Sequence, residues 1–203
     1  VLLITLLSIY LSNSSNGIKW IIFLIIFFWS IRLTLLMLQR KIGHGEDERY
    51  TKLRSWKEPG INFNLFALRQ VFLLQGIVIW CVTLPIQFML SKNDVNTLSF
   101  FNFIGLIIII VGFAWEAISD HQLNNFKKSS TNKNQFLKKG LWSLSRHPNY
   151  FGEILFWWGI FMFTIVDYIS LISIIGPLLF TYLLINVTGV KTMDKRMINN
   201  YSE

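Results

Sequence analysis

Long runs of apolar residues, separated by polar stretches, constrain the fold of this chain more than any other feature of its sequence. A helix needs about 20 mostly apolar residues to cross a hydrocarbon core about 30 Å thick, and several runs approach or reach that length. Segments buried in lipid must satisfy their own backbone hydrogen bonds, as a helix does. We expect six such segments, at residues 2–11, 18–38, 65–90, 98–118, 151–167 and 169–187.

The sequence therefore predicts an all-α fold, a polytopic transmembrane helical bundle of about six to seven spans. The first segment is too short to span alone, and the chain opens on Val1 rather than Met, so we expect the natural N-terminus to be missing and the first span to be truncated. No internal repeat, low-complexity tract or flexible linker divides the chain. We expect residues 1–203 to form a single integral membrane domain.

The positions of the basic residues agree with this division into segments. Residues 39–60, residues 121–149 and the C-terminal tail together hold fifteen Lys and Arg, whereas the opposite connections hold only Lys19 and Lys92. Cytoplasmic loops of membrane proteins collect Lys and Arg, so we expect these three regions to be cytoplasmic. The net charge of +8 then reflects topology and attraction to anionic lipid headgroups. No recognition motif for nucleic acid accompanies it.

Several common kinds of site are excluded by the sequence. Cys81 is the only cysteine, which rules out an intrachain disulfide and a cysteine-cluster metal site. The chain has no Gly-rich phosphate loop, no His-Glu-x-x-His zinc spacing and no Gly-x-Ser-x-Gly nucleophile turn. We predict no metal site. A nucleotide, if one binds, must lie in a pocket formed by membrane helices.

A polar string from Trp142 to Glu153 stands immediately before an apolar run. It contains a cation, an imidazole, an amide, a phenol and a carboxylate: Arg146, His147, Asn149, Tyr150 and Glu153. Polar groups at membrane depth are costly, so they are expected to face the bundle interior or a water-filled cavity. Asn149 and Glu153 are four residues apart and share one helix face. Helix capping is the alternative, but it requires fewer polar groups than the string provides.

A second polar face is expected at the end of the fourth segment. Glu116 and Asp120 are spaced four residues apart on one helix face, and Lys127 and Lys128 follow two turns later. The residues indicate either a solvated helix end or a groove. In the groove, the bases would bind phosphate and the acids would accept hydrogen bonds from a bound cofactor.

The third segment carries Arg69 and Gln75 on different helix faces, with Pro85 able to kink the helix further on. Arg69 can reach back to the membrane interface with its long side chain. Gln75 lies deeper, where an amide needs another helix, water or a ligand as its partner. Interhelical hydrogen bonding and substrate contact both remain open for Gln75.

The run Gly140-Leu141-Trp142, continued by Ser145-Arg146-His147-Pro148-Asn149-Tyr150-Phe151-Gly152-Glu153, resembles the C-terminal signature of the steroid 5-alpha-reductase superfamily. The resemblance is closest to the bacterial branch of that superfamily. It extends back through Trp29 and Arg32, residues 45–50, residues 72–76 and residues 112–120, and is concentrated in residues 112–196.

This resemblance implies a multi-pass reductase, in a bacterial inner membrane, that binds NADPH from the cytoplasmic side. Reduction would transfer hydride to the carbon–carbon double bond of an apolar enone taken from the lipid phase. Asn149 and Glu153 match positions near the nicotinamide, and Glu116, Asp120 and Lys127 match positions on the helix that lines the adenosine-phosphate end. Lys128, Arg146 and His147 are the further expected cofactor contacts, and Gln75, Tyr150 and Glu153 the expected catalytic residues.

Two departures from the superfamily pattern are visible. Gln75 is followed by Gly76, where steroid-reducing members carry a Glu that binds the substrate carbonyl, and Lys127 stands where the family often has Arg. Two other functions stay open. Membrane methyltransferases that use S-adenosylmethionine share the Arg-His-Pro-x-Tyr part of the string, and a non-catalytic lipid-binding protein would also carry these spans.

Overall fold

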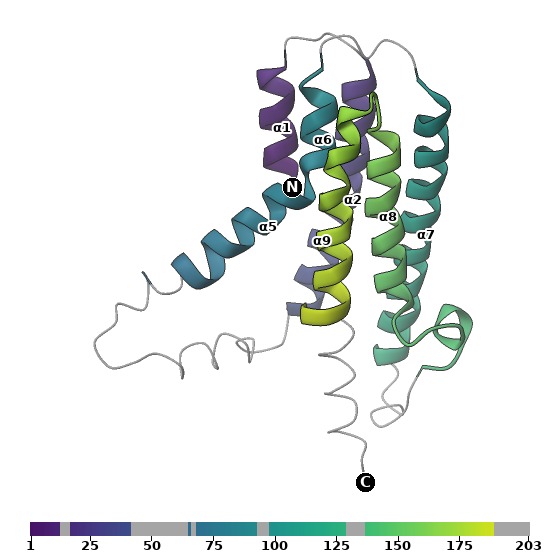
Figure 1. Cartoon of the computed structure of the whole chain (residues 1–203). Helices are drawn as coiled ribbons and strands as arrows, with labels where there is room; N and C mark the ends of the chain where they lie inside the picture. Colours follow the sequence, from purple (N-terminus) through teal and green to yellow (C-terminus); the bar gives the residue numbers. More distant parts are fainter. Residues whose placement is uncertain (13–16, 42–64, 66–67, 93–97, 129–136, 189–203) are drawn as a thin grey trace.

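The computed structural model describes residues 1–12, 17–41, 65, 68–92, 98–128 and 137–188. Within these residues the regular structure is entirely helical, which confirms the predicted all-α class (Figure 1). The elements are α1 (Leu2–Leu11), α2 (Gly17–Lys41), η1 (Leu68–Leu73), α5 (Leu74–Val82), α6 (Leu84–Leu90), α7 (Phe100–Lys128), η3 (Gly140–Ser143), α8 (Pro148–Phe163), η4 (Ile169–Ile174), α9 (Ile175–Leu183) and η5 (Leu184–Thr188).

The helices form a transmembrane bundle in which successive segments run in opposite directions (Figure 1). Among the described residues, three helices are long and apolar enough to cross a membrane: Gly17–Gln39, Phe100–Lys128 and Ile169–Val187. α2 and α7 finish, and α8 begins, at the same end of the bundle. We call this the basic end, because Lys127 and Lys128 end α7 there and Arg146 lies just before α8.

The third predicted segment is not one straight helix. It breaks at Thr83, and Pro85 stands at the start of α6, as the proline suggested. Proline cannot donate a backbone hydrogen bond, so Pro85 gives the carbonyl four residues earlier, that of Cys81, no helical partner. Side chains bond to neighbouring carbonyls at the break: the Thr83 hydroxyl donates to the carbonyls of Ile79 and Trp80, each at 3.0 Å, and the Gln87 amide donates to that of Trp80 at 2.9 Å. α5 therefore splays away from the bundle (Figure 1).

α7 is longer than the predicted span. The sequence suggested that the membrane segment ends at Ile118 and that a loop begins at His121, but the helix continues to Lys128. The polar residues of this extension are compatible with a helix, and the two lysines of its last turn interact favourably with the negative end of the helix dipole. The second polar face is therefore held on rigid helix and not in a loop.

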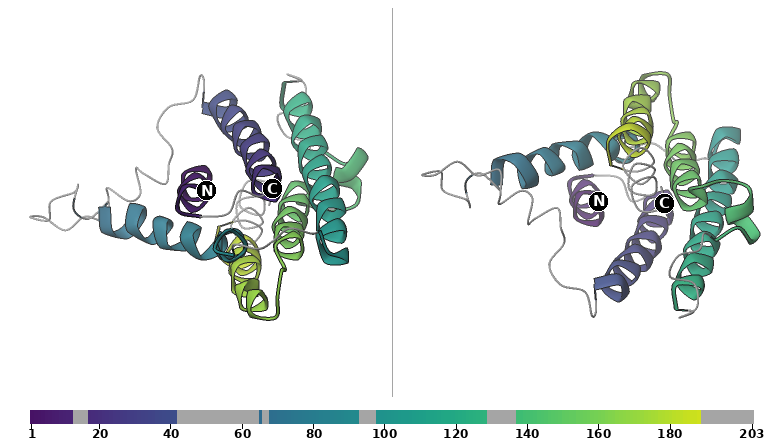
Figure 2. Two further views of the ribbon diagram at one scale, coloured as in Figure 1. Left: turned by 90° about the horizontal axis from the view of Figure 1, so that it is seen from above. Right: turned by 90° about the horizontal axis from the view of Figure 1, so that it is seen from below.

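α7 and α8 pack antiparallel along a seam of glycines, and both views of Figure 2 show the two helices side by side. Gly105 and Gly112 on α7 oppose Gly159 and Gly152 on α8, and in both helices the two glycines are seven residues apart. A Cβ added to Gly152 would lie 2.5 Å from the backbone nitrogen of Glu116. Small residues permit such close approach, which drives helix association where lipid weakens the hydrophobic effect.

Aromatic residues fill the bundle on the other side of α8. The Trp29 ring of α2 stacks on Phe156 with centroids 5.3 Å apart and meets Trp157 edge-on at 5.6 Å. Phe180 of α9 lies 5.7 Å from Trp157, so these rings join three helices. The apolar core that surrounds them comprises Ile22, Ile26, Val82, Ile86, Met89, Leu90, Ile109, Ile160 and Phe163.

An ion pair closes the end of the bundle opposite the basic end. Lys92, which follows α6, lies with its Nζ 2.7 Å from Oδ2 of Asp167, which follows α8. Asp167 also accepts a hydrogen bond from the backbone N–H of Ser170 at 2.7 Å. The contact joins two connections that are 75 residues apart in the sequence.

Candidate functional site

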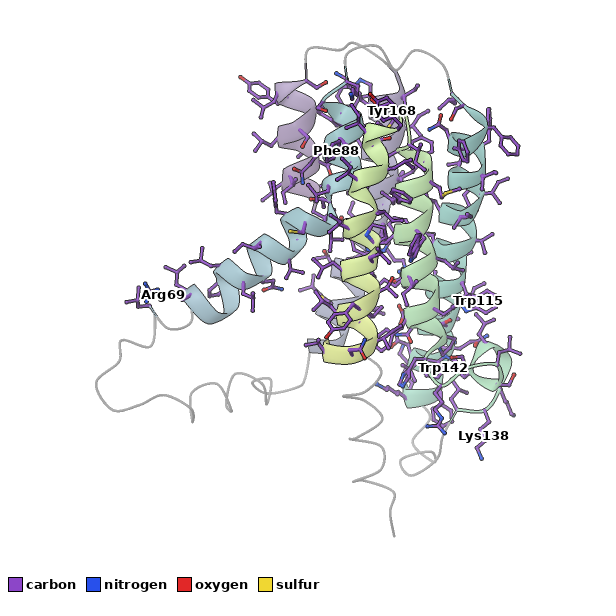
Figure 3. The ribbon with its side chains drawn as sticks, in the orientation of Figure 1. Arg69, Phe88, Trp115, Lys138, Trp142 and Tyr168 are labelled. Carbon is purple, nitrogen blue, oxygen red and sulfur yellow. The ribbon has the colours of Figure 1, made fainter. Side chains whose placement is uncertain are left out.

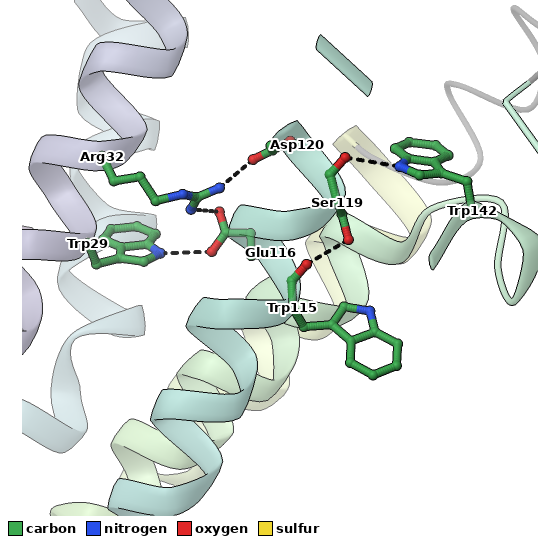
Figure 4. A network of polar contacts seen from close by, with 7 residues as sticks. All are labelled: Trp29, Arg32, Trp115, Glu116, Ser119, Asp120 and Trp142. Carbon is green, nitrogen blue, oxygen red and sulfur yellow. Dashed lines mark hydrogen bonds and ion pairs between the residues drawn. The ribbon is translucent and has the colours of Figure 1, made fainter. Parts of the chain in front are cut away.

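A single arginine binds the two acids of the predicted α7 face. Nη1 of Arg32 on α2 lies 2.8 Å from Oε1 of Glu116, and its Nη2 lies 2.5 Å from Oδ2 of Asp120 (Figure 4). We call Arg32, Glu116 and Asp120 the arginine clamp. The predicted shared face of the two acids is confirmed, because one guanidinium reaches both.

The arginine clamp is buried and has further support. Glu116 is 2% exposed and Asp120 4%, which excludes a solvated helix end as their environment. The indole N–H of Trp29 donates to Oε2 of Glu116 at 3.2 Å, and the guanidinium of Arg32 lies 5.6 Å from the ring centroid of Phe113. Charges at this depth are tolerated only when they are paired and hydrogen-bonded. The clamp therefore fixes α2 against α7.

Glu153 stands beside the arginine clamp without joining it. The glycine seam brings Gly152 against the backbone of Glu116, so the next residue, Glu153, lies at the level of the clamp. Its half-buried carboxyl makes no hydrogen bond or ion pair with the described residues. Asn149, one turn earlier on α8, is also half-buried and also bonds to no described residue. This face of α8 thus presents an amide and a carboxyl that are available to a ligand.

The remaining residues of the polar string begin α8. Pro148 is in the first turn of the helix, where proline is tolerated, as predicted. The His147 ring is 8% exposed and stacks on Tyr150 with centroids 5.4 Å apart, and both side chains make further interactions. Arg146 is exposed just before them. The string therefore lies where predicted, at the entrance of α8 and at the basic end of the bundle.

The two lysines predicted to contact phosphate end α7. Lys127 and Lys128 are exposed in its last turn, two turns beyond Asp120. They share the basic end with Arg146, but their side chains lie outside the buried cluster. The geometry suits contacts to the charged part of a ligand whose other end reaches Asn149 and Glu153.

Gln75 is not brought to this cluster. It lies on α5, which splays away and packs on α9 and η1, and its side chain is exposed. A shallow hollow of about 260 Å³ lies on the same helix, lined by Phe72, Leu73, Gly76, Ile77 and Trp80. The amide of Gln75 bonds to no described residue. Within the described residues it therefore makes no interhelical hydrogen bond.

A short 3₁₀ turn, η3, includes the first residues of the polar string and is fixed to the outer face of α7. The indole N–H of Trp142 donates to the carbonyl of Ser119 at 3.0 Å (Figure 4), and the N–H of Leu141 donates to Oε1 of Gln122 at 3.1 Å. Gly140 has φ +60° and packs so closely on Gln122 that a Cβ would lie 2.4 Å from its amide nitrogen. Glycine adopts this left-handed conformation without strain.

The roles of Trp29 and Arg32 were not predicted from their position in the second segment. An arginine inside a span is itself a signal, because such a charge almost always finds a partner in the bundle interior. The spacing could not show that the partners are Glu116 and Asp120, 84 and 88 residues away along the chain. Tyr50 and the rest of loop 45–50 lie outside the described residues.

Comparison with known proteins identifies a family for this chain. No curated protein and no solved structure matches the chain. The family described as "Protein of unknown function (DUF1295)" matches residues 1–203, which is the whole sequence. The chain therefore belongs to the DUF1295 family.

Proposed function

We propose that this protein is a membrane-embedded, NADPH-dependent reductase. Its substrate would be an apolar enone of steroid-like, isoprenoid or lipid character, reduced at its carbon–carbon double bond. The basic end of the bundle would face the cytoplasm of a bacterial cell, where NADPH is dissolved. The substrate would enter laterally from the lipid.

The observation that carries the proposal is the convergence of polar residues from three helices at the basic end of the bundle. Arg32 comes from α2, Glu116 and Asp120 from α7, and Asn149 and Glu153 from α8. Ionisable residues at membrane depth mark functional sites by default, because their burial is costly. The sequence resemblance to the steroid 5-alpha-reductase superfamily runs through these same residues.

Asn149 and Glu153, which bond to no described residue, suit the nicotinamide end of NADPH. A carboxamide has an N–H₂ donor and a carbonyl acceptor, and Glu153 and Asn149 offer an acceptor and an amide one turn apart. Lys127, Lys128 and Arg146 would hold the phosphates, with His147 close to them. NADPH supplies the hydride when bound, and the protein supplies binding, orientation and electrostatics.

The residues of the chain would then have separate roles in binding and positioning. The arginine clamp keeps α2 and α7 at a fixed separation, so that Glu153 stays in its position beside them. Glu116 and Asp120 retain oxygen lone pairs that can accept hydrogen bonds from a ribose while Arg32 holds them. Tyr150 would stack on or donate to the ligand, whereas Gln75, on the splayed α5, lies too far from this cluster to share the site.

The test is the affinity of the detergent-purified chain for NADPH, measured by nucleotide fluorescence, in Asn149→Ala and Glu153→Gln. Asn149→Ala removes an amide and Glu153→Gln replaces one acceptor oxygen by an N–H₂ donor, and no described residue bonds to either side chain, so folding should be retained while NADPH affinity falls at least tenfold. Gln87→Ala on α6 is the control for loss of an amide on the opposite half of the bundle; because this amide bonds to Trp80 and Thr83, thermal unfolding checks that the variant is folded. Gln87→Ala should leave NADPH affinity unchanged.

Two results would contradict the proposal. Unchanged NADPH affinity in both α8 variants would show that this face does not hold the cofactor. Binding of S-adenosylmethionine in place of NADPH would assign Arg146 and His147 to a methyltransferase site. Binding of neither would favour a lipid-binding protein without catalysis.

A further inference from the structure

The η3 turn lies at the level where the hydrocarbon core of the membrane ends. The apolar part of α7, residues 100–118, is about 28 Å long at about 1.5 Å per residue, close to the thickness of a hydrocarbon core. Ile118 is the last large apolar side chain of α7 that is exposed. Ser119 and Gln122, to which η3 is hydrogen-bonded, come directly after it. The turn is therefore held at the boundary between lipid tails and headgroups.

The turn also points away from the bundle. η3 projects from the outer side of α7 in both views of Figure 2, and Figure 3 shows Trp142 and Lys138 on that side. Leu144 is 72% exposed there, and Lys138 and Lys139 are exposed in the segment that leads into the turn. Trp142, with its indole N–H bonded to α7, is half-buried at the same level. A membrane interface favours such a combination of tryptophan, apolar residue and lysine.

The sequence around the turn carries only positively charged side chains. Residues 121–152 contain six Lys and Arg and no Asp or Glu. Neither Lys138 nor Lys139 makes an ion pair with a described residue. The two acids of α7, Glu116 and Asp120, are buried on its inner side and bound by Arg32. The lysines of the turn are therefore left to interact with an anion from outside the bundle.

We propose that the η3 turn, with Lys138, Lys139 and Leu144, is a binding site for the headgroup of an anionic phospholipid of the surrounding bilayer. Leu144 would contact the acyl chains while the two ammonium groups bind the phosphate. Such a site anchors the loop that leads into Arg146 and His147, so the lipid would hold the entrance of α8 at a fixed depth. The proposal does not depend on the reaction that the protein catalyses.

The chemistry favours a lipid over a dissolved phosphate. A soluble anion would gain nothing from Leu144, whereas a phospholipid presents both a phosphate for the lysines and hydrocarbon for the exposed leucine. The bonds from Trp142 and Leu141 to α7 prevent the turn from folding back over the bundle. The site is thus built for a molecule that stands in the membrane beside α7.

The test is native mass spectrometry of the full chain, purified in detergent and mixed with equal amounts of phosphatidylglycerol and phosphatidylcholine. The wild-type chain should retain several-fold more phosphatidylglycerol. Lys138→Gln and Lys139→Gln should each reduce this preference, and the double variant should abolish it. Arg69→Gln is the matched control: it also removes one exposed positive charge, from η1 on the opposite side of the bundle (Figure 3), and should keep the preference.

Three outcomes would overturn the proposal. The first is equal retention of the two lipids by the wild-type chain. The second is a loss of preference in Arg69→Gln as large as in Lys139→Gln, which would indicate a general effect of net charge. The third is release of phosphatidylglycerol by inorganic phosphate but not by chloride at the same ionic strength, which would assign the lysines to a soluble phosphate. Thermal unfolding of each variant checks that it is folded.

Discussion

The contact between Gly152 and Glu116 gives the sharpest prediction about what holds the site together. In Gly152→Ala, the new Cβ would lie 2.5 Å from the Glu116 nitrogen, whereas ordinary contact begins at 3.4 Å. The difference, 3.4 − 2.5 = 0.9 Å, must be gained by moving one helix, because the atom that it meets is backbone. We expect the α7–α8 seam to open by about 1 Å at this level.

The expected energy follows from two opposing effects. Overpacking a close contact costs about 1–3 kcal/mol, and alanine in place of glycine returns up to about 1 kcal/mol of helix propensity. Gly152→Ala should therefore destabilise the chain by about 1–2 kcal/mol, which lowers the melting temperature by about 2–8 °C for a chain of this length. The opened seam should also weaken NADPH binding, since Glu153 moves relative to the arginine clamp.

The assay is thermal unfolding in detergent, with Gly76→Ala as the matched control. Nothing lies within 4 Å of a Cβ added to Gly76 on α5, so that variant should gain helix propensity and unfold at the same or a higher temperature. A Gly152→Ala chain as stable as the Gly76→Ala chain would refute the close packing of α7 on α8.

Three further predictions concern other contacts of the fold. Arg32→Gln leaves two buried carboxylates without their cation and should cost about 3–5 kcal/mol in a denaturant titration, with Arg32→Lys restoring only part of it. The hydrogen bond from Lys92 lowers the pKa of Asp167 below its ordinary value of 3.8, so the stability it contributes is complete above that pH and disappears as pH falls through the lowered pKa. Asp167→Asn should remove this acid dependence of the melting temperature, and an unchanged profile would contradict the ion pair. Trp142→Phe removes the hydrogen bond to Ser119 and should lower stability by about 1 kcal/mol. If proteolysis of the η3 turn rises more than global unfolding does, the lost stability belongs to that turn.

Much of the fold can be predicted from the sequence, because continuous apolar runs report lipid-facing helices directly. The positions of α1, α2, α7, α8 and the last segment all agree with the runs. The end of α7 was misjudged, since hydrophobicity marks where lipid ends and not where a helix ends. The seven-residue spacing of Gly105–Gly112 and Gly152–Gly159 was a usable signal of close helix packing that composition alone does not reveal.

The site could be predicted only in part. Spacing of four residues placed Glu116 with Asp120 and Asn149 with Glu153, because that spacing defines a helix face whatever the tertiary structure. Which faces meet depends on helix rotation and on the glycine seam, so the pairing of Arg32 with both acids was not visible. The separation of Gln75 from the cluster likewise follows from the break at Thr83, whose direction no local pattern specifies.

The most direct test of the central claim is a thermal-shift titration of the detergent-purified chain with NADPH, NADH and S-adenosylmethionine. A ligand that binds only the folded state raises its stability by mass action, by about 2.7 kcal/mol at a hundred times its dissociation constant. Our account predicts stabilisation by NADPH, with NADH weaker because it lacks the 2′-phosphate, and none by S-adenosylmethionine. Stabilisation by S-adenosylmethionine alone would contradict it.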